Sequence, residues 1–357
     1  MSAAELLEAR DGRPEKVKEC YMRRSACVSL FGFFFFVALS GQTIAGIHGF
    51  LYSKGTFTTL DVPGSLSTTA NAINDEGQIV GVFAQPGEPG EAGQPGHAFL
   101  FTGGTFTSID VPGSISHEAL GINDTGQIVG RFFSSPDNLH GFLLTGGRFT
   151  TLDVPGSVLT QALGINDAGQ VVGSFDIPAG TNGFVFAGGQ FLTLPVPTGS
   201  AFIQALGIND RGQIVGNFFD ARGIPQGYVF AGGTFAPVHV PGSEETSPQD
   251  INDTGQIVGS FRDAAGAVHG FLYNDGTFTT LDVPGSRLTQ VFGINDTGQI
   301  VGRFVDATVV PEPATWLLLA SGILGLIYFR KYILCRRTSS QVSPAKFPRQ
   351  QGSHYRR

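Results

Sequence analysis

Ile165-Asn166-Asp167-Ala168-Gly169-Gln170-Val171-Val172-Gly173 is one of six closely similar stretches in this 357-residue chain, and these stretches decide its fold. Their asparagines lie 49 residues apart once and then 43 residues apart four times, at Asn74, Asn123, Asn166, Asn209, Asn252 and Asn295. A fixed period in this range marks a repeat architecture, because a single unit cannot bury its own apolar face. The repeats therefore predict one closed domain over residues 46–306.

Each repeat contains four strand-like stretches. In the unit around Asn166 they cover residues 161–166, 170–175, 183–186 and 191–196, and turn-forming residues bound each of them. No extended helical period occurs between residues 46 and 306. Four antiparallel strands in 40–50 residues are typical of a propeller blade. Six copies predict an all-β fold, a six-bladed β-propeller of four-stranded repeats about 43 residues long.

The two ends of the repeat region are complementary. The chain enters at His48-Gly49-Phe50, the third strand of a unit, and the last copy stops after its second strand at Phe304. Residues 48–62 would complete the blade begun by residues 288–304, which would close the ring and cover both sheet edges. An open solenoid is the alternative, but it would leave uncapped half-units at each end.

The Asn-Asp-x-Gly part of each stretch predicts a tight turn. Asn and Asp side chains bond to nearby backbone, and Gly supplies a positive φ. The turn residues are Asn74, Asp75, Gly77, Asn123, Asp124, Gly126, Asn166, Asp167, Gly169, Asn209, Asp210, Gly212, Asn252, Asp253, Gly255, Asn295, Asp296 and Gly298. A calcium loop is the other interpretation, but the motif lacks alternating oxygen ligands and a distal Glu.

A His-Gly-Phe phrase repeats at His48, His140 and His269, with a variant at His97, and Asn182 and Gln226 take the same place in the other units. Asn and Gln share hydrogen bonding with His but are poor transition-metal ligands. The pattern therefore favours a structural hydrogen bond over a metal site.

Variation between the repeats gathers in the segment that precedes this phrase, at residues 84–96, 133–139, 176–181, 219–225 and 262–268. These loops should lie on one face, which is either a binding face or an unconstrained surface.

Charge separates the body of the chain from its ends. Residues 46–309 hold 23 acidic and 8 basic residues, a net charge of −15. An acidic body excludes nucleic acid as a partner, because such binding needs a basic face. It suits a domain outside the cytoplasm, where acidity favours solubility or attracts cations such as calcium. Cys20, Cys27 and Cys335 lie outside the repeats, so the body has no disulfide.

The N-terminal segment has the pattern of a secretory leader. Met22-Arg23-Arg24 precedes an apolar run over residues 25–40, and small residues follow. We expect a leader and signal helix over residues 1–45, cleaved after Ser40 or Ala45, with Met22 as an alternative start. An uncleaved anchor is the other interpretation, but the run is shorter than the ~20 residues that span a bilayer.

The C-terminal segment has three parts. A linker at 307–313 contains Val310, Pro311, Glu312 and Pro313, an apolar stretch covers 314–329, and Arg330 and Lys331 follow it. An uncharged apolar run before basic residues predicts a transmembrane helix with a cytoplasmic tail at 330–357. A buried helix is the alternative.

These three parts resemble the PEP-CTERM sorting signal of Gram-negative bacteria. The resemblance implies processing by an exosortase-type transpeptidase, and export to the cell surface or the exopolysaccharide matrix. Residues 332–357 continue past the point where such signals usually end. The repeats in turn resemble the HAF repeat family of predicted extracellular proteins, whose motif appears here as His97-Ala98-Phe99. That family implies no catalytic residues.

The acidic residues of the body recur with the repeat, so turns and strand ends explain them and no catalytic pair stands out. We therefore expect a non-catalytic, exported binding or structural module without a cofactor. Its partners would be an extracellular polysaccharide or protein, an exosortase-type enzyme, and the membrane through the C-terminal helix. The alternatives are a propeller hydrolase or lyase acting on extracellular glycans, and a calcium-stabilised adhesion module.

Overall fold

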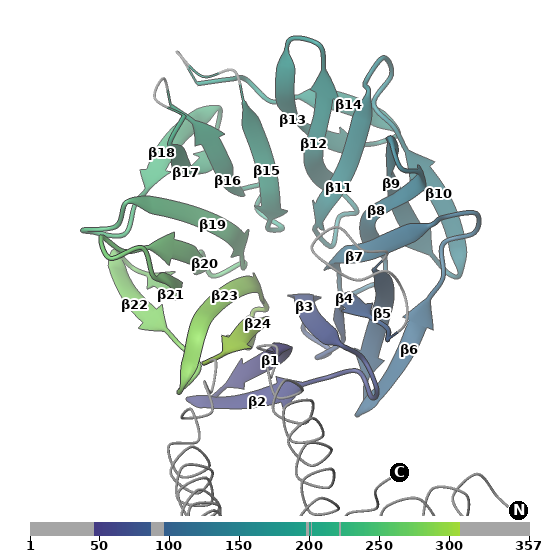
Figure 1. The fold of residues 1–357 in the computed structure, drawn as a ribbon. Coiled ribbons are helices and arrows are strands. Elements are labelled where there is room, and N and C mark those ends of the chain that lie inside the picture. The colour runs from purple at the N-terminus through teal and green to yellow at the C-terminus, as the bar shows by residue number, and fades with distance from the viewer. Residues whose placement is uncertain (1–45, 87–95, 198–199, 201, 221–222, 308–357) are drawn as a thin grey trace, which may run out of the picture. The chain divides into compact units, whose positions relative to one another are not determined.

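A computed structural model describes residues 46–86, 96–197, 200, 202–220 and 223–307, all within one compact unit of the chain. This part contains 24 strands and no helix, and the strands radiate around a centre (Figure 1). No helix capable of crossing a membrane occurs among these residues. The leader, the sorting motif, the anchor helix and the basic tail expected from the sequence lie outside the described residues, as do parts of the loops at 84–96 and 219–225.

Strands at four successive distances from the centre make up the sheets (Figure 1). The innermost strands are β3 (Ser67–Ile73), β7 (Ser116–Ile122), β11 (Leu159–Ile165), β15 (Ile203–Ile208), β19 (Glu245–Ile251) and β23 (Ser286–Ile294). The second strands are β4 (Ile79–Ala84), β8 (Ile128–Ser135), β12 (Val171–Ile177), β16 (Ile214–Phe219), β20 (Ile257–Arg262) and β24 (Ile300–Asp306).

The third strands are β5 (His97–Thr102), β9 (Asn138–Thr145), β13 (Gly180–Ala187), β17 (Pro225–Ala231), β21 (Val268–Asn274) and β1 (Ile47–Ser53). The outermost strands are β6 (Thr105–Ile109), β10 (Arg148–Leu152), β14 (Gln190–Thr193), β18 (Thr234–Val238), β22 (Thr277–Leu281) and β2 (Thr56–Leu60). The described residues therefore form an all-β propeller.

Four of the sheets are separate four-stranded blades, and the remaining eight strands are joined in one sheet. Within that sheet a single parallel pair, Ile47 with Ser67, connects β1 to β3. The pairing predicted for the two ends of the repeats is present. β1 runs antiparallel to β24 from Ile47–Val305 to Tyr52–Ile300, and β2 pairs with β1. The first strand of the domain thus covers the edge of the last one.

The glycine of the Val-Gly dipeptide in each repeat is explained by packing. Gly173 on β12 lies under the ring of Phe184 on β13, and a Cβ atom at Gly173 would lie 2.8 Å from that ring. Such a separation is shorter than van der Waals contact, and the backbone carbonyl oxygen of Gln161 on β11 would lie nearer still. A larger residue would therefore displace the backbone of β11 as well as the ring. Phe184 is fully buried, as are Phe50, Phe99, Phe142 and Phe271 at the equivalent positions.

The core lies between neighbouring sheets rather than within one blade. One cluster combines Val129 of β8 with Ile165, Val171 and Phe184 of the next blade. Clusters of the same make-up recur around the ring. Each blade therefore depends on its neighbours for burial of its apolar faces, which is the physical basis of a closed repeat fold.

Candidate functional site

The Asn-Asp turns meet at one mouth of the central channel. Within a turn, Gly169 N donates to Asn166 O at 3.0 Å, and Gly169 has a φ of 72°. The Asn166 side chain fixes Gln170 on the next strand, since its Oδ1 accepts from Gln170 N and its Nδ2 donates to Gln170 Oε1, both at 2.9 Å. The same bonds recur in all six copies.

Each turn also binds the next one. Asn166 Nδ2 donates to the carbonyl oxygen of Asn209 at 3.1 Å, and Asp167 N donates to Asp210 Oδ1 at 2.8 Å. The chain of bonds continues around the channel and ends where it began, because Asn295 Nδ2 donates to Asn74 O at 3.0 Å. The sequence indicated local turns but not this inter-blade ring. The signal was the invariance of both Asn and Asp, which exceeds what a turn alone requires.

The carboxylates of this ring face one another across a small cavity of about 90 Å³. Burial, followed by the charges of neighbouring aspartates, raises the pKa of Asp75 and Asp210 above 3.8. Among the described residues, no group of three or more His, Cys, Asp or Glu side chains is arranged to hold a metal ion. In the ring each carboxylate instead accepts a backbone N–H of its neighbour.

A single carboxyl group lies deeper in the channel. Asp250 occupies the position held by Gly121, Gly164, Gly207 and Gly293 in other repeats, and it borders a cavity of about 110 Å³. It accepts hydrogen bonds from Ile251 N at 2.9 Å and from Ile294 N, on the next blade, at 3.0 Å. Burial raises the pKa of Asp250 to about 7 in spite of these bonds. Asp250 was not predicted as a site residue, although an alignment of the repeats shows that it stands where most other repeats have glycine.

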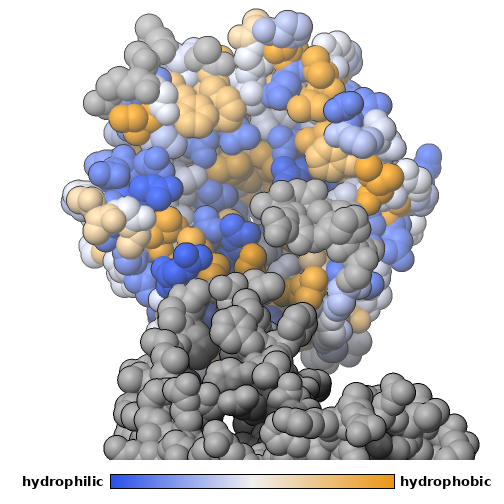
Figure 2. Space-filling model, in the orientation of Figure 1, coloured by the Kyte–Doolittle hydropathy of each residue, from blue (hydrophilic) through white to orange (hydrophobic). Residues whose placement is uncertain are grey.

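The variable loops belong to the opposite face. In an antiparallel blade, the connection between the second and third strands lies at the end away from the turn between the first and second. The loop segments at 133–139, 176–181 and 262–268 therefore lie at the far end from the Asn-Asp ring. Figure 2 shows hydrophilic residues interspersed with hydrophobic ones over the described part of the face it presents.

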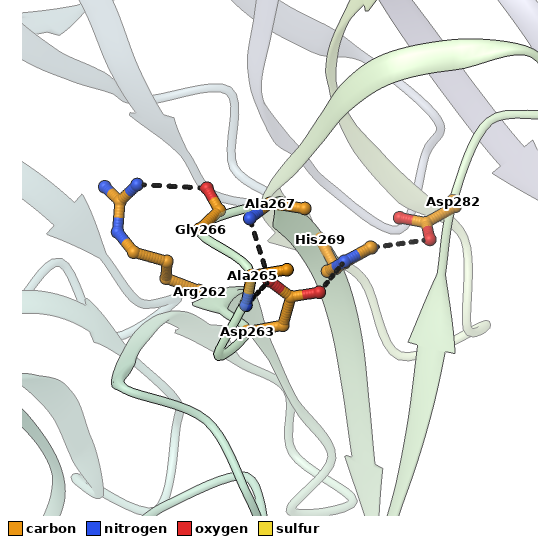
Figure 3. Close-up of polar contacts among 7 residues, drawn as sticks. All are labelled: Arg262, Asp263, Ala265, Gly266, Ala267, His269 and Asp282. Atoms are coloured by element: carbon orange, nitrogen blue, oxygen red, sulfur yellow. Dashed lines mark hydrogen bonds and ion pairs between the residues drawn. The ribbon is translucent and has the colours of Figure 1, made fainter.

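The histidines of the repeats lie at this loop end, and the predicted structural hydrogen bond is confirmed for three of them. His269 Nδ1 bonds to Asp282 Oδ2 at 2.8 Å, and its Nε2 lies 3.4 Å from Asp263 Oδ2 (Figure 3). His269 also stacks on Phe261 with ring centroids 5.2 Å apart. Burial lowers the pKa of His269, but its bonds to Asp282 and Asp263 outweigh that effect, so its pKa lies above 6.5.

The other two pairs repeat this geometry. His48 bonds to Asp61 at 2.8 Å and to Asp306 at 3.2 Å, and His140 bonds to Asp153 at 2.8 Å. Asp61, Asp153 and Asp282 belong to a repeated Leu-Asp-Val-Pro phrase, and from the sequence they were expected only to end strands. Their partners could have been found from the sequence, since repeats with Asn182 or Gln226 in place of His have Pro195 or His239 in place of Asp.

A pocket of about 210 Å³ also opens at the loop end, where the inner strands of three successive blades meet. Its inner wall carries uncharged polar side chains, Gln204, Asn217, Ser247, Ser260 and Gln290. Phe219, Phe261, Pro225 and Val268 come from the ends of two variable loops, and Glu245 and Arg262 form an ion pair at 3.2 Å beside them. A concave site with a few convergent polar groups and apolar walls is suited to binding a small ligand.

Three comparisons with known proteins bear on these features. Residues 309–331 match the model of the PEP-CTERM protein-sorting motif. This motif implies an exported, membrane-anchored protein of a Gram-negative bacterium that is processed by an exosortase. A search of curated proteins gave no match.

Among solved structures, a TolB-type protein from Agrobacterium tumefaciens is similar, with a TM-score of 0.56 and 11% identity over 74% of this chain and 99% of that one. A fungal lectin from Aleuria aurantia, described as a six-bladed β-propeller, has a TM-score of 0.43 and 11% identity over 67% of this chain and 95% of that one. The likeness to the TolB-type protein agrees with the propeller fold seen here.

Proposed function

We propose that this chain is a non-catalytic binding module displayed at the cell surface or in the exopolysaccharide matrix. The observation that carries the proposal is the joining of a sorting motif at residues 309–331 to a propeller with a pocket among its variable loops. A rigid scaffold with variable loops at one end is an arrangement that supports recognition. The partner class is an extracellular polysaccharide or protein.

The proposal includes a six-bladed ring of HAF-type repeats. The eight-stranded sheet then counts as two blades linked by the single pair Ile47–Ser67. The closed chain of bonds through six Asn-Asp turns supports this count, because each blade contributes one turn to the ring. The proposed organisation is a leader at 1–45, the propeller at 46–306, a sorting linker at 307–313, an anchor helix at 314–329 and a basic cytoplasmic tail at 330–357.

Surface display can be tested on intact cells. An epitope inserted in the variable loop at 133–139 should react with antibody without permeabilisation. Replacing Pro311 and Pro313 by Ala should leave the chain membrane-bound and unprocessed, whereas Pro195→Ala, outside the motif, should behave as the unmodified chain. Recovery of the intact unmodified chain from the soluble cell interior would disprove the proposal.

One observation favours a hydrolase as the second candidate. Ser134 Oγ lies 3.0 Å from His140 Nε2, and His140 Nδ1 bonds to Asp153 at 2.8 Å, which is the order of groups in a serine nucleophile with its base. In two other blades, however, Asp306 and Asp263 take the place of this serine beside the histidine. The role that Ser134, Asp263 and Asp306 share is to hold the imidazole ring of the histidine in place. We therefore expect no labelling of Ser134 by a fluorophosphonate probe. Labelling that Ser134→Ala removes would favour the hydrolase.

A further inference from the structure

The pocket at the loop end arises from a difference between repeats. On the innermost strands, the position five residues before the Asn of each turn holds Thr69, Glu118, Gln161, Gln204, Ser247 or Gln290. Its partner across the strand pair is Val82, Arg131, Ser174, Asn217, Ser260 or Arg303, in the same order. The size of the side chains at these two positions decides whether space remains between blades.

Arginine occupies this space in two places. Arg131 bonds to Glu118 on its own blade at 2.9 Å and to Gln161 on the next blade. Arg303 bonds to Gln290 at 2.8 Å and lies over the ring of Phe292, 5.8 Å from its centroid. Arg303 is half-buried, and this burial lowers its pKa. A long side chain therefore fits at this position of the fold.

Short side chains leave the space open where Asn217 and Ser260 stand. Ser247, opposite Ser260, is shorter than the Gln that three other repeats carry at its position. The resulting cavity of about 210 Å³ is more than tenfold the roughly 10–15 Å³ that one water molecule requires on this measure. The pocket is therefore sized for a small ring-shaped group rather than for a single water.

The inner wall offers hydrogen bonds that the protein does not use. No hydrogen bond joins the side-chain amide of Gln204 to another described residue. Asn217 donates to Ser247 Oγ at 3.0 Å, and its Oδ1 accepts no hydrogen bond from a described residue. Gln290 accepts from Arg303, so its NH₂ group is available as a donor. The wall thus presents uncharged donors and acceptors to whatever enters.

The other walls of the pocket are aromatic surface and a paired charge. Phe219 and Phe261 supply aromatic surface, which packs against apolar C–H groups. The charges beside the pocket are already paired, because Arg262 bonds to Glu245 and to the carbonyl oxygen of Gly266. An anionic ligand would have to break that pair. A neutral ligand with several hydroxyl groups and C–H faces matches all three features.

We propose that this pocket, bordered by β15–β16, β19–β20 and β23, binds one residue of a neutral saccharide. This inference rests on the proposed function as a surface binding module and names the ligand class of its loop end. Sites of this size hold one sugar unit, so firm attachment to a polymer would come from several displayed copies acting together.

The test uses the full-length chain, purified in detergent, on an array of neutral oligosaccharides, with uronic-acid oligosaccharides for comparison. Ser260→Arg installs the side chain that two other blades carry at this position, and it should weaken binding of neutral sugars at least tenfold. Val158→Arg is the matched control. It adds the same charge at an exposed site of the loop end, where another repeat has Arg287, and should bind as the unmodified chain.

Gln204→Leu gives an independent check, because it removes an unused amide without filling the cavity and should also weaken binding. Circular dichroism spectra should be the same for all four chains. Equal binding by Ser260→Arg and the unmodified chain would overturn the pocket and leave surface display intact. Binding of the uronic-acid sugars alone, or of none, would also overturn it. Failure of the chain to reach the surface would instead refute the proposed function itself.

Discussion

Replacement of Asp250 by Ala should change the stability of the propeller in a way that depends on pH. Ala is the native residue, Ala72, at the equivalent position of the first repeat. The pKa of Asp250 is about 7 in the folded chain because burial outweighs its two backbone hydrogen bonds, against 3.8 for an unperturbed Asp. The folded state therefore holds a proton that the unfolded chain has already lost, and stability falls as pH rises between about 4 and 7.

The size of the effect follows from this shift. A difference of about 3 pKa units corresponds to about 4 kcal/mol, since each unit is worth 1.36 kcal/mol. Below pH 4 Asp250 is protonated in both the folded and the unfolded chain, so its raised pKa no longer affects the free energy of unfolding. Asp250→Ala should then be less stable because it lacks the bonds to Ile251 and Ile294, at about 1 kcal/mol each. Between pH 4 and pH 8 the variant should gain up to about 4 kcal/mol relative to the unmodified chain.

Urea unfolding followed by far-UV circular dichroism at pH 4, 5.5, 7 and 8.5 measures this difference. The free energies of unfolding of the two chains should cross at about pH 5, because a gain of about 1.36 kcal/mol per pH unit above pH 4 offsets the loss of about 2 kcal/mol within about 1.5 pH units. A stability difference between Asp250→Ala and the unmodified chain that is constant over the whole range would refute the reasoning.

Three further predictions concern the pairing of the first and last strands, the packing around the glycine of β12, and the ring of Asn-Asp turns. The pKa of His48 lies above 6.5 because its bonds to Asp61 and Asp306 outweigh burial, so its contribution is present below pH 6.5 and lost as pH rises through the folded-state pKa. Asp306→Asn should therefore reduce thermal stability at pH 6, by less than about 1 kcal/mol, and not at pH 9. Gly173→Ala should lower the melting temperature strongly, because the carbonyl oxygen of Gln161 and the ring of Phe184 occupy the space for a Cβ. Asn166→Ala removes two hydrogen bonds to Gln170 within its own repeat and one to Asn209 on the next blade, at about 1 kcal/mol each, and denaturant titration should show that loss.

Local patterns were sufficient for the elements of this fold. The alternation of apolar residues and the Gly-containing turns predicted the strands, because the residues that decide them lie within a few positions of one another. The observed limits differ from the predicted ones by up to three residues, as in β13, which covers Gly180–Ala187 where 183–186 was predicted. The complementary half-units at the two ends predicted the pairing of β1 with β24. The histidine phrase predicted a structural hydrogen bond, and His48, His140 and His269 make one.

Contacts between repeats could not be predicted in the same way. The bond from Asn295 to Asn74 spans 221 residues, and the sequence analysis assigned both residues to local turns. The open pocket depends on two short side chains, Ser247 and Ser260, and no pattern in the sequence marks either of them.

By itself the sequence determined a repeating β-fold, the complementarity of its ends and a C-terminal sorting motif, because each of these features depends on residues close together along the chain. Only the tertiary structure showed which differences between the repeats change the burial of a charge or open a pocket. Closing the ring brings equivalent positions of adjacent blades into contact, and the volume and charge left there depend on pairs of side chains, not on either one alone. That is why Asp250 lies in a desolvating channel while its equivalents are glycine or alanine, and why one gap between blades stays open while arginine occupies another.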